Sequence, residues 1–132
     1  MTDGGAMHRG LAWVAGAHAA AALVHGVPHV RAAVWLTPWQ SGFVAATVLG
    51  PFAAARVAGE RQVRGGLAFS LLLAASVAFG VAHHWLLGGV DDVKNVAAPH
   101  HAPFEASAVA LAVVGAAGVA AGLRVAYSRS AM

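Results

Sequence analysis

Four apolar stretches, each long enough to cross a lipid bilayer, dominate this sequence. They cover residues 11–36, 41–57, 67–87 and 104–125, and charged side chains occur only near their ends. A helix of about 20 apolar residues spans the hydrocarbon core, and a backbone in lipid must satisfy its own hydrogen bonds, which favours helices. The sequence therefore predicts an all-α integral membrane protein, an up-down bundle of four transmembrane helices in a single domain, residues 1–132.

The amino-acid composition excludes several other classes of protein. Hydrophobic residues make up 59% of the chain and charged residues only 10%, whereas soluble domains average about 25% charged residues. The chain has no cysteine, which excludes disulfide bonds, iron–sulfur clusters and thiolate nucleophiles. It also lacks a basic stripe, so the expected partner is the lipid bilayer and not nucleic acid.

The distribution of basic residues predicts how the bundle is oriented. Six of the eight Lys and Arg residues lie near the N-terminus, at the end of the second segment or just after it, or at the end of the fourth segment or just after it. They are Arg9, Arg56, Arg61, Arg64, Arg124 and Arg129. Because cytoplasmic loops carry an excess of basic residues, we expect both termini in the cytoplasm of a multi-pass protein of the cell (plasma) membrane. Residues 88–103 then form an extracytoplasmic loop.

Histidine is unusually frequent for such an apolar chain, with eight residues. Ionisable side chains are costly inside a membrane and usually serve a function there. Most lie at or beyond the extracytoplasmic ends of the segments, namely His25, His29, His83, His84, His100 and His101. On the first helix His18, His25 and His29 share one face, within about 40° of one another. His25 and His29 are four residues apart, a spacing at which two helical side chains can bind one ion.

These positions predict a transition-metal site at the outer ends of the first and third helices, used for redox chemistry or metal handling. The candidate ligands are His25, His29, His83, His84 and Glu105. His83 and His84 differ by about 100° around a helix, so only one can point squarely inward. The matching stretches GVPH (26–29) and GVAH (80–83) favour His83. Imidazole suits Cu, Fe or Zn, and no catalytic residue is indicated.

Other polar residues near this end have simpler interpretations. Glu105, in the first turn of the fourth helix, is either a ligand or a favourable charge at a helix N-terminus. Two pairs in the 88–103 loop are expected to be solvated, although they would also suit a funnel for a metal ion. These pairs are Asp91 with Asp92 and His100 with His101.

Two alternatives to a metal-ion site remain open at this stage. In the first, His29 and His83 are axial ligands of a b-type haem that transfers electrons, a layout that resembles membrane b-type cytochromes. In the second, the chain is a cofactor-free accessory subunit of a membrane complex. The small residues Gly118 and Gly122 on the fourth helix permit close helix packing and could support a homo-oligomer.

Overall fold

The computed structural model describes residues 3–128, and every regular element in that part of the chain is helical. The four long helices are α1 (Asp3–Arg31), α2 (Pro38–Glu60), α3 (Gln62–Val81) and α4 (Ala98–Tyr127). A π-helix, η1 (Ala82–Leu86), continues α3, and a short 3-10 helix, η2 (Val93–Asn95), precedes α4. The four helices are long and apolar enough to cross a membrane, so the prediction of four such helices is confirmed.

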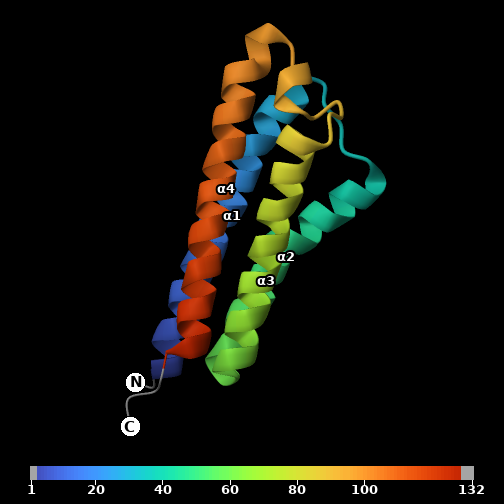
Figure 1. Cartoon of the computed structure of the whole chain (residues 1–132). Coiled ribbons are helices and arrows are strands. Elements are labelled where there is room, and N and C mark those ends of the chain that lie inside the picture. The colour runs from blue at the N-terminus through green and yellow to red at the C-terminus, as the bar shows by residue number, and fades with distance from the viewer. Residues whose placement is uncertain (1–2, 129–132) are drawn as a thin grey trace.

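The helices form an antiparallel bundle in which each packs against its neighbours in sequence and α4 returns to α1. This order places α1 and α3 diagonally opposite each other. Figure 1 shows the start of α1 and the end of α4 at one end of the bundle, which we call the termini end. The links between α1 and α2 and between η1 and α4 lie at the other end, which we call the loop end.

At the termini end, glycine lets backbones touch. Only Arg61 separates α2 from α3, so the two helices must cross closely. A Cβ atom on Gly65 would lie 2.1 Å from the backbone nitrogen of Ala58, and one on Gly66 would lie 2.7 Å from the carbonyl oxygen of Gly122. Small residues at these crossings therefore hold α2 and α4 tightly against α3.

Gly118 and Gly122 of α4 both face α3 of the same chain. A Cβ atom would lie 2.2 Å from Leu73 Cδ1 at Gly118 and 2.4 Å from Ser70 Oγ at Gly122. The Ser70 hydroxyl also donates a hydrogen bond to the carbonyl of Val119 (2.9 Å). The spacing that permits close packing is thus used within the bundle.

The loop end is held by specific turns. Helix α1 continues through Pro28 and ends at Arg31, after which Ala33 adopts a left-handed conformation (φ 54°). Thr37 then caps α2: its hydroxyl accepts from the Gln40 backbone N–H, and the Gln40 side chain accepts from the Thr37 N–H (2.7 Å). This capping box fixes where α2 begins.

Helices α2 and α4 begin in different ways at the loop end. In Figure 1 the first turns of α2 lean away from the other three helices. Helix α4 begins at Ala98, so residues 98–103 of the predicted loop belong to its first turns. The connection before it folds back over the bundle, where Val93 and Val96 pack with Val34 and Phe104.

Candidate metal centre

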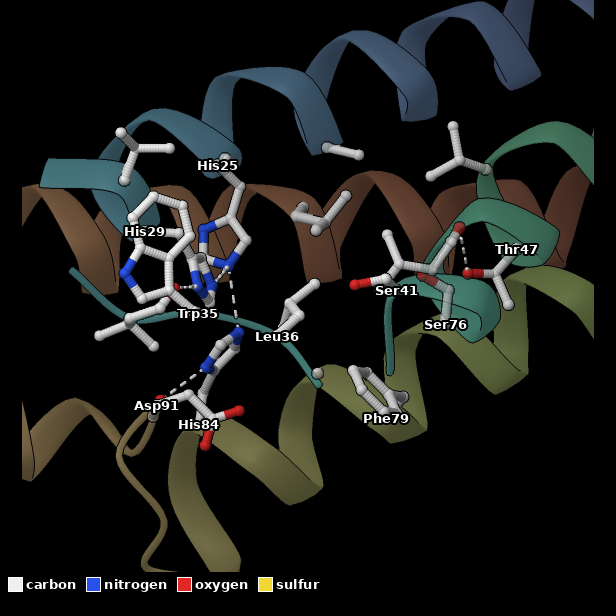
Figure 2. Close-up of a pocket in the computed structure, with 18 residues that line it drawn as sticks. His25, His29, Trp35, Leu36, Ser41, Thr47, Ser76, Phe79, His84 and Asp91 are labelled. Atoms are coloured by element: carbon white, nitrogen blue, oxygen red, sulfur yellow. Dashed lines mark hydrogen bonds between the residues drawn. The ribbon is translucent and has the colours of Figure 1, made fainter. Parts of the chain in front are cut away.

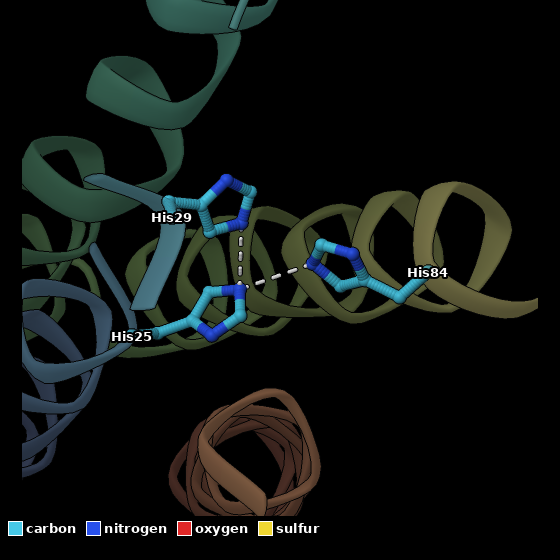
Figure 3. Close-up of side chains that lie close together, drawn as sticks. All are labelled: His25, His29 and His84. Atoms are coloured by element: carbon cyan, nitrogen blue, oxygen red, sulfur yellow. Dashed lines mark hydrogen bonds between the residues drawn. The ribbon is translucent and has the colours of Figure 1, made fainter. Parts of the chain in front are cut away.

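Three histidines gather at the loop end. His25 and His29 come from α1, and His84 comes from η1 across the bundle diagonal. The Nε2 atom of His25 lies 3.1 Å from Nε2 of His29 and 3.1 Å from Nε2 of His84. Figure 3 shows the three rings pointing toward one another. One nitrogen from each ring lies within 4.8 Å of the others, so this group could hold a metal ion.

Local helix geometry brings the three side chains together. His25 and His29 share one face of α1 because side chains four residues apart in an α-helix lie one above the other. His84 belongs to the π-helix, in which the N–H of Leu87 donates to the carbonyl of Ala82, five residues back (2.9 Å). Such wider turns often occur at functional sites, and this one directs His84 inward while accommodating His83 beside it.

The outer nitrogen of His25 faces a serine hydroxyl. Nδ1 of His25 lies 2.8 Å from the hydroxyl oxygen of Ser107 on α4. The Ser107 hydroxyl proton is already donated to the carbonyl of Phe104 (2.9 Å). With that hydroxyl proton on the Phe104 carbonyl, the serine oxygen is free to accept, and on this basis we assign the proton of neutral His25 to Nδ1.

The outer nitrogens of the other two rings face backbone carbonyls, which only accept hydrogen bonds. Nδ1 of His29 donates to the carbonyl of Val34 (3.3 Å), just after the left-handed residue that ends α1. Nδ1 of His84 donates to the carbonyl of Asp91 (2.8 Å). We assign both tautomers from these partners, so both rings carry their proton on Nδ1.

All three Nε2 atoms therefore present lone pairs to the same point. In the neutral tautomers none has a proton to donate to the others, and three facing acceptors repel one another. A cation between them removes this repulsion. Bonds of about 2.0–2.1 Å to a tetrahedral ion would place ligand nitrogens about 3.3 Å apart, close to the 3.1 Å of the two pairs that His25 makes, and the His29–His84 pair lies within 4.8 Å.

The three rings pack against a buried aromatic side chain and also border a cavity. Phe104 is fully buried and its ring centroid lies 5.4, 4.7 and 5.1 Å from those of His25, His29 and His84. The three histidines also line a cavity of about 340 Å³ between α1, α2 and α3. Figure 2 shows the histidines at one end of this cavity and Leu36 and Phe79 along its walls.

The remaining predicted ligands lie outside this group. Nδ1 of His83 lies 3.3 Å from the side-chain amide nitrogen of Gln40 and 3.3 Å from Oδ2 of Asp91. Its ring packs against Phe79, with centroids 4.3 Å apart. Glu105 is about half exposed and lies 3.9 Å from Nδ1 of His101. Of the adjacent pair, the structure thus brings His84, not the favoured His83, to His25 and His29.

The fold gives two other groups of polar residues roles that differ from the sequence expectation. Asp91 and Asp92, expected to be solvated, are buried at 6% and 3% exposure. Asp91 positions both His83 and His84, and the Asp92 carboxylate accepts from the backbone N–H of Lys94 (2.9 Å). His100 and His101, placed in the loop from sequence, lie in the first turn of α4.

His18 is buried deeper in the bundle, with 1% of its surface exposed. Its Nε2 lies 3.4 Å from the hydroxyl of Ser76, and its Nδ1 has no hydrogen-bond partner among the described residues. His18 is on the same face of α1 as His25 but two turns away. It therefore provides a natural comparison for the three clustered histidines.

Sequence reasoning could have found His84 but not all of its supports. Leu73, Ser76, Gly80 and His84 recur at helical spacing, so their common face predicts His84 as inward. The carbonyls of Val34 and Asp91 carry no residue-type signal, because every residue has one. Comparison of the chain with known proteins found no matching family model, curated protein or solved structure.

Proposed function

We propose that this chain is an integral membrane metalloprotein that binds one transition-metal ion through His25, His29 and His84. One observation carries the proposal: three Nε2 atoms converge while each Nδ1 lies within hydrogen-bond distance of a separate oxygen atom. Metal-binding histidines usually donate their second ring nitrogen to a carbonyl, carboxylate or hydroxyl oxygen, which fixes the ring orientation. All three rings here have such a partner.

The chemistry of the ligands favours an ion such as Zn, Cu or Fe, since neutral imidazole suits all three. Catalytic sites typically use three protein ligands and leave a position for water or substrate, whereas structural sites use four. The cavity beside the three histidines leaves room for a ligand from outside the chain. We therefore propose an open site that activates a bound molecule, in redox chemistry or metal-assisted reactions.

The proposal places the site near one membrane surface. The four apolar helices fit a membrane protein, and the basic residues favour the termini end as the cytoplasmic side. The loop end, with the three histidines, would then lie on the extracytoplasmic side. A site at that depth can exchange its ion with the outside and still contact the hydrocarbon core.

An ion accounts for these contacts better than a haem between His29 and His83. His29 packs with His25, His84 and Phe104, whereas His83 contacts Gln40, Phe79 and Asp91. With the assigned tautomers, a cofactor-free accessory subunit would leave three buried or half-buried lone pairs facing one another without a proton. Such unsatisfied polar groups cost about 1–3 kcal/mol each.

The test is binding of Co²⁺, whose visible absorption bands report on its ligands, to purified protein in lipid nanodiscs. We expect one Co²⁺ per chain with the strong bands of a four-coordinate ion. His25→Ala and His84→Ala should each weaken binding at least 100-fold. The matched controls are His18→Ala, which removes a buried histidine from the same face of α1, and His83→Ala, which removes the neighbour of His84.

The controls decide how the result is interpreted. His18→Ala should bind Co²⁺ like the natural protein. The Co²⁺ affinity of His83→Ala should fall no more than about tenfold, because His83 is connected to the ligands only through Asp91. Thermal unfolding of each metal-free variant shows that the bundle is intact. If the natural protein bound no Co²⁺, or if His83→Ala were as damaging as His84→Ala, the proposed ligand set would be wrong.

A further inference from the structure

We propose that the open position of this metal site receives the oxygen of a neutral, lipophilic hydroxyl compound that enters from the bilayer between α1 and α2. The inference rests on the proposed metal site and names the class of molecule that the site takes. It is carried by the cavity next to the three histidines, by the absence of Lys and Arg among the described residues that line it, and by an apolar groove on the helix surface that shares part of this lining.

The size of the cavity sets the size of the molecule. Its volume is about 340 Å³. An engineered apolar cavity of about 150 Å³ holds a benzene molecule, so this cavity has room for roughly two rings or a chain of similar bulk. That is small for a membrane phospholipid but suitable for a phenol or medium-chain alcohol.

The lining of the cavity selects an uncharged molecule. None of the described residues that line it is Lys or Arg, and its one carboxylate, Asp91, lies beside His83. An anionic headgroup would therefore find no counter-charge other than the ion. The walls are mostly apolar, with Leu36 and Phe79 between the histidines and a distant group of hydroxyls (Figure 2). A molecule with one oxygen at the ion and an apolar body would fit this distribution.

The route into the cavity leads from the apolar side of the bundle. A second groove, of about 310 Å³, lies between α1 and α2. It shares with the cavity the residues Ala22, Leu36, Ser41, Val44 and Val48. Its outer edges include Leu23 and Leu49, which are 76% and 65% exposed. In a bilayer these side chains would contact lipid, so the groove opens toward the hydrocarbon core.

Two glycines keep the space beside the ion open. Gly26 and Gly80 both line the cavity, and a Cβ atom at either position would meet nothing within 4 Å. Gly80 precedes His84 by one turn of helix. A larger side chain at either position would extend into the cavity without displacing a packed neighbour.

The experiment uses Co²⁺-loaded protein in nanodiscs and 2-naphthol as the probe. Naphthalene is the matched probe without the oxygen. We expect 2-naphthol to shift the visible bands of bound Co²⁺ in a saturable manner and naphthalene to leave them unchanged. Because the bands respond only to the ligands of the ion, partition of either compound into lipid does not contribute.

Variants test the route. Gly80→Leu and Gly26→Leu should load with Co²⁺ as the natural protein does but need at least tenfold more 2-naphthol for the same shift. Gly16→Leu is the control, because Gly16 also has open space at Cβ and lies on α1 away from the cavity. It should respond to 2-naphthol normally.

The outcomes separate this inference from the metal site itself. If Co²⁺ binds but 2-naphthol does not shift its visible bands, the inference is overturned and the metal site stands. The same holds if the two leucine variants need no more 2-naphthol than the natural protein does for the same shift. If Co²⁺ does not bind to the natural protein, the metal site is overturned and the inference falls with it.

Discussion

The two ends of the bundle use the same residue type for opposite purposes. At the termini end Gly65, Gly66 and Gly122 lie where helix backbones touch, and a Cβ atom at any of them would meet another atom within 2.8 Å. At the loop end Gly26 and Gly80 face open space. At the termini end, glycine is required because the helices are in close contact. At the loop end, it leaves the cavity beside the histidines open.

This contrast separates stability from function within one small domain. The termini end brings Leu11, Ala15, Ala55, Phe69 and Leu73 together into the main apolar core. The loop end carries the three histidines, a π-helix and a cavity, none of which improves packing. We infer that close packing at one end allows the other end to remain open for a ligand.

The largest expected effect tests the termini end. Gly65→Ala should lower the free energy of unfolding by about 3 kcal/mol, because overpacking in a filled interior costs about 1–3 kcal/mol or more. The new Cβ would lie 2.1 Å from the backbone nitrogen of Ala58, and backbone yields less than a side chain. Thermal unfolding followed by circular dichroism in detergent measures the change. An unchanged unfolding temperature would mean that α2 and α3 do not cross so closely.

The next effect tests the support of His25. Ser107→Ala should weaken Co²⁺ binding about 10- to 100-fold, as expected when the partner of a metal-binding histidine is removed. Ser70→Ala is the control, since its hydroxyl is also largely buried but bonds to Val119 far from the site. Equilibrium dialysis measures both affinities. Equal affinities in the two variants would contradict the assigned tautomer of His25.

A smaller effect of opposite sign tests the loop end. Gly80→Ala should raise the free energy of unfolding by about 0.5–1 kcal/mol, because glycine inside a helix is less stable than alanine by that amount. The same substitution would thus stabilise one end of the bundle and destabilise the other. The unfolding measurement used for Gly65→Ala applies here, and a loss of stability would show that the space beside Gly80 is filled.

The smallest effect concerns the turn that ends α1. Ala33→Gly should raise the free energy of unfolding by a few tenths of a kcal/mol. The left-handed conformation costs a non-glycine residue about 1–2 kcal/mol, and glycine removes this cost. Most of the gain is offset because glycine also gives the unfolded chain more conformational freedom. Co²⁺ affinity should stay within twofold, since the carbonyl that orients His29 is unchanged. A marked loss of stability would indicate that Ala33 has a different backbone conformation.

The sequence predicts the helices well because apolar length is a local property. Residues 41–57 fall within α2, and all but the last residue of the predicted segment 67–87 fall within α3 and η1. The prediction was less sharp where tertiary contacts decide the outcome. In the structure, α1 begins at Asp3, before the start of the predicted segment 11–36, and continues through Pro28. It ends at Arg31 because the chain then enters a left-handed turn at Ala33.

For the candidate site, spacing alone identifies His25 and His29, since side chains four residues apart on a helix must be neighbours. The helical face shared with Ser76 and Gly80 indicates His84, but its orientation depends on a π-helix and on the carbonyl of Asp91, which a loop brings back over the bundle. Neither of these two supports leaves a pattern in residue types. Glu105 has a ligand's chemistry and a suitable depth, but its position on α4 directs it to His101.

The most direct test of the central claim is X-ray absorption spectroscopy of Zn²⁺-loaded protein, which counts the atoms bound to the ion and identifies imidazole. We expect three imidazole nitrogens at about 2.0–2.1 Å and one further light atom, as in a four-coordinate zinc site with an open position. The number of imidazoles should fall in His84→Ala and stay at three in His83→Ala. A shell of oxygen atoms without imidazole, or the same spectrum in both variants, would contradict the three-histidine site.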